Sequence, residues 1–125
     1  MRTLLIKNSE KIKSKFKEVV RNNKLEGIFL ADMEGLPIVS FLDEEVNEEV
    51  ISASSAAIVS AGMITANDAK KPDINQIIVD TEQGYMVFIP VKNEFILCII
   101  TQKDTKLGML RLIADEVEEF LEKLE

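Results

Sequence analysis

Few residues in this chain could perform catalysis. The sequence has no His, which removes the commonest general base and a frequent metal ligand. The single cysteine, Cys98, stands in the unbroken apolar run of residues 95–100, which is typical of a small core residue rather than of a nucleophile. No GxxxxGK[ST] or GxGxxG loop is present, so nucleotide is not bound by those loops.

Adjacent carboxylates are the remaining candidates for acid–base chemistry. The three pairs are Glu44-Glu45, Glu48-Glu49 and Glu118-Glu119. Each falls in or beside a predicted helix, where such charges normally face solvent. The aromatic residues are few and do not alternate with the lysines, so no platform for single-stranded nucleic acid is predicted. We expect no enzymatic activity, no metal and no cofactor.

Length and composition predict one globular domain over residues 1–125. The chain is 46% apolar and has a net charge of −7. One cysteine and no signal-peptide pattern favour a cytoplasmic protein. The first 24 residues carry eight Lys/Arg against two Glu, whereas the remainder carries seven against twenty. A basic first helix could bind nucleic acid or an anionic membrane, but we favour packing beside the acidic last helix of the same domain.

Residues 46–66, VNEEVISASSAAIVSAGMITA, must be positioned before any other element. No charged residue occurs between Val50 and Asn67. One helical stripe consists of Val46, Val50, Ala53, Ala57, Ala61 and Ile64, and further apolar residues continue around the helix. A helix that is apolar nearly all round needs cover on more than one side, so we expect a second copy of the chain to cover it. A fully buried helix in a self-sufficient domain is the alternative, and a membrane span is disfavoured because Ser, Thr and Gly dilute the apolarity.

The other predicted elements flank this helix. Ser9 is expected to cap a helix to residue 23, which residues 4–6 extend, and Asp43 is expected to cap the central helix. Asp104 or Thr105 caps the last helix. The predicted strands are residues 27–31, 36–42, 74–81, 85–91 and 95–101. The apolar stripe of the last helix is Leu110, Ile113, Val117, Phe120, Leu121 and Leu124.

These elements predict an α/β (α+β) sandwich with one helix on one face of the sheet and two on the other. The most apolar strands belong inside an antiparallel sheet, which gives the strand order 2-1-5-4-3. Pro37 places its strand at one edge, and Pro90 indicates a bulge or an unpaired amide. The other edge, with Ile77-Ile78-Val79, is open to pairing with a second copy.

Three short motifs carry a resemblance to a known family. The run LEGIFLADMEGLPI at residues 25–38 resembles the signature xEGxxLxDxxGLPI of Roadblock/dynein light chain proteins. Residues 83–91, QGYMVFIPV, are similar to xGYxxxxPV, and residues 106–110, KLGML, are similar to the xLGxxR/L helix start. With the Ser/Ala-rich middle helix, the resemblance spans residues 9–124, and it does not extend to the basic lead at residues 1–7.

The resemblance implies a profilin-like fold and a homodimer, or a heterodimer with a related chain, whose sheet is continuous across the edge strands. It also implies a non-catalytic partner of a Ras-like small GTPase. The expected dimer or partner interface consists of Ile51, Ser54, Ser55, Ile58, Val59, Gly62, Met63, Asn75, Ile77 and Val79. The alternatives are a structural subunit of a motor or trafficking complex, a small-molecule sensor, and membrane attachment through the basic helix.

Overall fold

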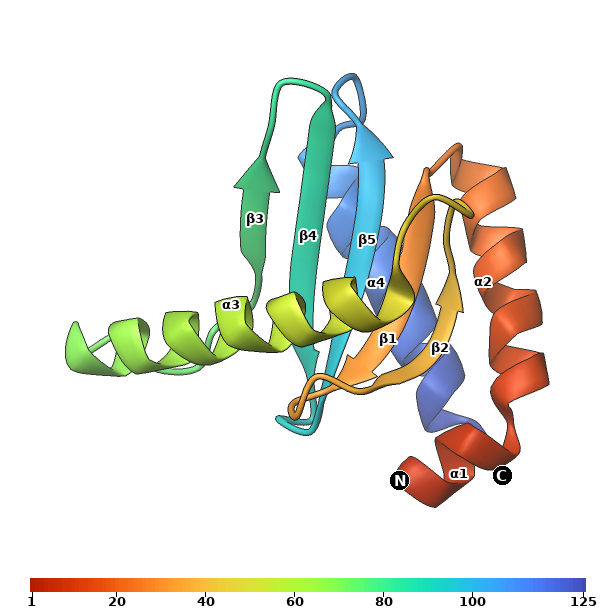
Figure 1. Ribbon diagram of the computed structural model, residues 1–125, viewed down its shortest axis with the longest axis horizontal. Coiled ribbons are helices and arrows are strands. Elements are labelled where there is room, and N and C mark those ends of the chain that lie inside the picture. The colour runs from red at the N-terminus through yellow and green to blue at the C-terminus, as the bar shows by residue number, and fades with distance from the viewer.

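A computed structural model describes residues 1–125 as a five-stranded antiparallel sheet between two layers of helices (Figure 1). The elements are α1 (Arg2–Lys7), α2 (Ser9–Asn23), β1 (Gly27–Asp32), β2 (Pro37–Phe41), α3 (Glu48–Asp68), β3 (Ile77–Asp80), β4 (Gly84–Val91), β5 (Phe95–Gln102) and α4 (Leu107–Glu122). The strand order β2-β1-β5-β4-β3 confirms the predicted topology. Helix α3 crosses one face, and α2 and α4 cover the other face together with the short α1.

Alternate residues of the central strands supply the two cores. In β1, Ile28 and Leu30 join the core under α1, α2 and α4, whereas Phe29 and Ala31 join the smaller core under α3. The larger core contains 21 buried residues and the smaller one contains 7, so the α3 face has much less of its own material to cover it. Cys98 is fully buried in the smaller core, which confirms that it is a core residue.

The N-terminal helices are separate, whereas one continuous helix was predicted. Asn8 lies between α1 and α2, and its side-chain amide donates to the carbonyl of Leu4 at 2.8 Å. The expected cap at Ser9 is wrong, because Ser9 is already the first helical residue and Asn8 occupies the capping position. The same Asn8 amide lies 3.4 Å from the carbonyl oxygen of Glu125, so the C-terminal residue lies beside the junction of α1 and α2.

The cap of helix α3 lies four residues later than predicted, at Asn47 instead of Asp43. The side chain of Asn47 caps it by accepting from the Val50 amide at 3.0 Å. Asp43 instead accepts from the Glu45 amide at 2.9 Å, which closes a separate turn. Both residues are good helix caps, and only the path of the chain from β2 to the sheet face decides between them.

The prolines lie where the sheet tolerates them. Pro37 begins the edge strand β2, as predicted. Pro90 pairs with Ile96 of β5 without a bulge, and β3 reaches only as far as Phe88, so no neighbouring strand requires an amide at position 90. The bulge occurs instead between β1 and β2, after Leu30. Strand β3 is shorter than the predicted 74–81.

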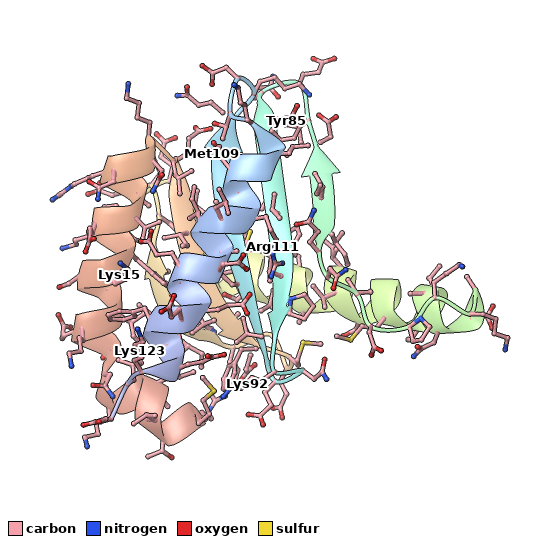
Figure 2. The ribbon with its side chains drawn as sticks, turned by 180° about the vertical axis from the view of Figure 1, so that it is seen from behind. Lys15, Tyr85, Lys92, Met109, Arg111 and Lys123 are labelled. Atoms are coloured by element: carbon pink, nitrogen blue, oxygen red, sulfur yellow. The ribbon has the colours of Figure 1, made fainter.

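Helices α2 and α4 pack side by side, as their opposite charges predicted. The ammonium group of Lys15 lies 3.0 Å from the carboxylate of Glu116 and 5.7 Å from the centre of the Phe120 ring. Figure 2 shows both helices on the same side of the sheet, with Lys15 between them. The hydrogen bond to Glu116 raises the pKa of Lys15 in spite of partial burial. The predicted stripe of α4 is buried, except that Phe120 is only partly covered.

The turn between β1 and β2 is organised by Asp32. Its buried carboxylate accepts from the backbone amides of Glu34 and Leu36, both at 2.9 Å, and pairs with the guanidinium of Arg2 in α1. Burial alone would raise the pKa of Asp32, but the two backbone amides and the guanidinium outweigh it and lower the pKa. In the same turn Gly35 has φ +90, and a Cβ there would lie 2.9 Å from the Cα of Ala53 in α3.

We predict that Gly35→Ala destabilises the fold by about 1–3 kcal/mol, because Ala would be strained at positive φ and would press on the backbone of α3. Urea unfolding measures the change in unfolding free energy. Gly108→Ala is the matched control, because nothing lies within 4 Å of a Cβ at that helical position. Equal stabilities for the two variants would show that the turn does not constrain α3.

We predict that Asp32→Asn destabilises the fold at pH 7 and that the difference from the unmodified chain shrinks in acid. Because the pKa is lowered on folding, the ionised carboxylate stabilises the folded state above about pH 4, the ordinary Asp value. That contribution is lost as the pH falls through the still lower pKa of the folded state. Unfolding free energies between pH 7 and pH 3 test this, with Asp104→Asn in an exposed turn as the control. A difference that does not depend on pH would contradict the assignment.

Candidate functional site

Helix α3 places only one narrow face on the sheet. Its buried residues are Ser52, Ser55, Ala56 and Val59. The opposite side is open to solvent, with Val50 63% exposed and Ile64 70% exposed. Ala53, Ala57 and Ala61 lie between these two residues and are also exposed. From Val50 onward, the stripe seen in the sequence is therefore on the solvent-facing side of the helix, whereas Val46 precedes the helix. We call Val50, Ala53, Ala57, Ala61 and Ile64 the outer stripe.

Seven α3 residues were predicted to form an outer face, and the structure places them on different sides. Ser54 and Ile58 are exposed, with Ile58 at 37%. Ile51, Gly62 and Met63 are half-buried. Placing Ser55 and Val59 on the outer face was wrong, because both are buried beneath the helix, and Val59 packs in the smaller core with Phe29 and Phe88.

The three predicted residues near β3 lie at an open edge of the sheet. Strand β3 pairs only with β4, so its other side has no neighbour. Ile77 and Val79 are half-buried and pack against the α3 side, whereas Ile78 points to the opposite face. Asn75 precedes the strand and is exposed, and its carbonyl oxygen lies 3.5 Å from Nη1 of Arg111. Gly62 allows α3 to approach this edge, because a Cβ there would lie 2.6 Å from Cδ1 of Ile77.

A groove of about 370 Å³ runs between α3 and the sheet near this edge. It contains five of the predicted residues, Ile51, Ser54, Ser55, Ile58 and Val79, together with Val46, Asn47, Val50, Met86 and Phe88, which were not predicted. Met86 and Phe88 alternate along β4 on the side of the sheet that α3 covers. The alternation in β4 could have indicated them once the face under α3 was known.

The groove offers apolar surface rather than reactive groups. The hydroxyl of Ser54 donates to the carbonyl of Val50 at 3.0 Å, and that of Ser55 donates to the carbonyl of Ile51. The helix backbone thus satisfies both hydroxyls. Cys98 is fully buried beneath the helix, and burial raises the pKa of its thiol well above the ordinary value. No group of three or more Asp, Glu, Cys or His residues could hold a metal ion. The arrangement is suited to burying an apolar surface of another molecule.

Helix α3 is also long and apolar enough to cross a membrane by composition alone. It has 21 residues, and its most apolar window has a mean hydropathy of 1.4 and is 22% buried. Its buried residues pack on the sheet, which is the behaviour of a helix that contributes to a core.

Residues 11–101 match the family model described as the Roadblock/LC7 domain, and this chain belongs to that family. The match includes both strands of the Asp32 turn, the whole of α3 and the β3 edge. The expected family is thereby confirmed.

Comparison with known proteins also finds a distant relative and several structures of the same fold. Protein MJ0310 of Methanocaldococcus jannaschii is 29% identical over 93 residues, which cover 72% of this chain and 81% of that protein. The structure of Myxococcus xanthus MglB aligns with a TM-score of 0.83 at 19% identity over 90% of this chain and 93% of MglB. A second MglB structure, described as having a tetrameric arrangement, aligns with a TM-score of 0.78 at 14% identity and covers 90% and 86% of the two chains. Acanthamoeba castellanii profilin II aligns with a TM-score of 0.63 at 8% identity over 87% and 94%, which confirms the profilin-like fold.

We predict that Ile58→Glu reduces self-association without unfolding the chain, because Ile58 borders the groove and its side chain already reaches solvent. Sedimentation velocity over a hundredfold range of concentration would report the change in mass. Leu112→Glu is the matched control, because Leu112 is 62% exposed on α4, on the other face of the sheet. Equal masses for both variants and the unmodified chain at every concentration would contradict the prediction.

Proposed function

We propose that this protein is a dimeric, non-catalytic regulatory or scaffold module that binds a Ras-like small GTPase in the cytoplasm. The observation that carries the proposal is the outer stripe of α3 beside the open β3 edge and the apolar groove. Membership of the Roadblock/LC7 family supports it, and a similar fold occurs in an MglB structure with a tetrameric arrangement.

Self-association is supported by the small residues at the centre of the outer stripe. Ala53, Ala57 and Ala61 allow another helix to approach closely, while Val50 and Ile64 at the two ends provide larger apolar contacts. Two antiparallel copies of α3 would bring the Val50 end of one copy to the Ile64 end of the other. The partner copy is either identical or a related Roadblock chain, and β3 would pair with its counterpart to extend the sheet.

The joined α3 helices would form one composite surface for the GTPase. The groove has no nucleophile, no metal-ligand cluster and no unsatisfied hydroxyl, so any effect on GTP hydrolysis would come from binding and ordering the switch segments of the GTPase. The interface residues predicted from the sequence remain the candidates. Ser54 and Ile58 would make direct contacts, while Ser55 and Val59 would act by supporting the helix from below.

A titration against Ras-like GTPases of the same cell tests the proposal. We expect one of them to bind with at least tenfold different affinity in its GTP-loaded and GDP-loaded forms, and Ile58→Glu to weaken that binding while Leu112→Glu does not. Isothermal calorimetry measures affinity, and release of phosphate measures turnover. Binding with unchanged hydrolysis would assign the scaffold role, as in a structural subunit. Failure of every GTPase to bind in either state would reject the GTPase proposal.

A further inference from the structure

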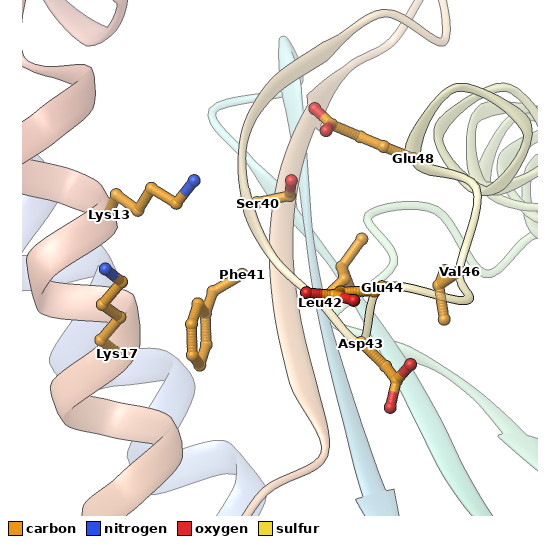
Figure 3. Close-up of a pocket in the computed structure, with 9 residues that line it drawn as sticks. All are labelled: Lys13, Lys17, Ser40, Phe41, Leu42, Asp43, Glu44, Val46 and Glu48. Carbon is orange, nitrogen blue, oxygen red and sulfur yellow. The ribbon is translucent and has the colours of Figure 1, made fainter.

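The second open edge of the sheet, at β2, borders a hollow that the proposed function does not use. Strand β2 has only β1 as a neighbour. Beside its free edge lies a hollow of about 390 Å³ between α2 and the segment that leads into α3 (Figure 3). It lies at the opposite edge of the sheet from β3, so a ligand here would not compete with pairing through β3.

The ladder of β1 shows which way the β2 backbone points. The Met33 amide donates to the carbonyl of Glu94 at 3.1 Å, on the β5 side. The amide of the preceding residue, Asp32, donates to the carbonyl of Leu36 at 2.9 Å, on the β2 side. Backbone groups alternate in direction along a strand, so Ile28 and Leu30, like Asp32, direct theirs toward β2.

Ser40 consequently directs its amide and carbonyl away from the sheet. Ile28 lies opposite Phe41 and Leu30 lies opposite Val39, so these two β2 residues bond to β1 and Ser40 between them faces outward. No hydrogen bond outside the regular elements involves the backbone of residues 38–42. Ser40 also lines the hollow, so an unpaired donor and acceptor lie at its wall.

Two lysines of α2 border this edge without an anionic partner. Neither Lys13 nor Lys17 has a carboxylate within 4.0 Å, in contrast to Lys15, which is paired with Glu116. Figure 3 shows the Lys13 side chain reaching from α2 toward the strand. The Lys17 ammonium group lies 5.9 Å from the centre of the Phe41 ring. Four residues along a helix span about 6 Å, and two residues along a strand span about 6.6 Å. The two lysine positions on α2 are therefore spaced like alternate residues of an added strand.

The opposite wall of the hollow has the opposite charge. Glu44 and Glu48 line it from the segment before α3 and the first turn of α3, across β2 from the lysines (Figure 3). Neither carboxylate lies within 4.0 Å of a basic group, and the Asp43 carboxylate beside them is used by a turn. Side chains of a strand alternate between its two sides, so the residues between the acidic ones would face this wall and should be uncharged or basic.

We propose that the free edge of β2 binds an extended segment of a partner protein as a sixth strand, with acidic residues at alternate positions opposite Lys13 and Lys17. Backbone hydrogen bonds to Ser40 would provide affinity, and the two lysines would select the charge pattern. Pro37 has no amide and ends the usable edge on one side, so the segment is short and centred on Ser40.

Fluorescence anisotropy with a capped, labelled eight-residue peptide in which Glu alternates with Thr tests the proposal. We expect saturable binding that weakens with added salt, and at least tenfold weaker binding to the Lys13→Glu/Lys17→Glu variant. The control is Lys7→Glu/Lys11→Glu, which makes the same change in net charge at exposed positions outside the hollow and should retain affinity within about twofold. If the Lys13→Glu/Lys17→Glu variant unfolds, Lys13→Gln/Lys17→Gln replaces it, and we expect the same loss of affinity. Absence of binding at millimolar peptide, or equal loss in the control, would overturn the proposal.

The strand geometry is tested separately. Ser40→Pro removes the outward amide without removing a hydrogen bond to β1, and it should weaken binding of the Thr–Glu peptide at least tenfold. Ser40→Ala, which removes the hydroxyl but keeps the amide, should not. A peptide of the same composition with its Glu residues adjacent should bind at least tenfold more weakly than the alternating one. Equal binding of the two peptides, or no effect of Ser40→Pro in a folded chain, would overturn the added strand. A fall in the sedimenting mass of Ser40→Pro without peptide would assign the edge to a second copy and would also overturn it.

Discussion

The structure depends on unequal cover of the two sheet faces. Three helices cover one face over a core of 21 buried residues, whereas α3 alone covers the other face over a core of 7. Burial of apolar area is the main stabilising term in a domain of this size, so the larger core contributes more to stability than the core beneath α3. The outer stripe of α3 is exposed in the folded chain, so it can contact another molecule while the core beneath the helix stays intact.

The two sheet edges differ as a result of the same chain path. The β3 edge is short, apolar and next to the outer stripe, so geometry and hydropathy both favour an apolar partner there. The β2 edge begins with a proline and is bordered by lysines on one side and glutamates on the other, which favours a polar, patterned partner. One small sheet thus offers two chemically distinct edges, and the strand order separates them by its full width.

The strand order and the family were predictable because both depend on strong local signals: unbroken apolar strands, edge prolines and short motifs around Asp32 and Gly84. The start of α3 was not predictable, since Asp43 and Asn47 are both good caps. The side of α3 that meets the sheet was also not predictable, because an apolar residue occurs on nearly every side. The close approach of Gly35 to Ala53 and of Gly62 to Ile77 determines which side of α3 meets the sheet. Both are contacts between segments that are distant in sequence.

The neighbouring ends of the chain have a consequence for architecture. The Asn8 side chain reaches Glu125, so the C-terminal end of the fold lies beside the junction of α1 and α2, one short helix away from Met1. A domain of this kind can be inserted into a surface loop of a larger protein, because the two points of attachment in the host loop need not move far apart. Figure 1 shows both ends of the chain beside α1, whereas α3 crosses the sheet at another level, so a host attached there would leave α3 uncovered.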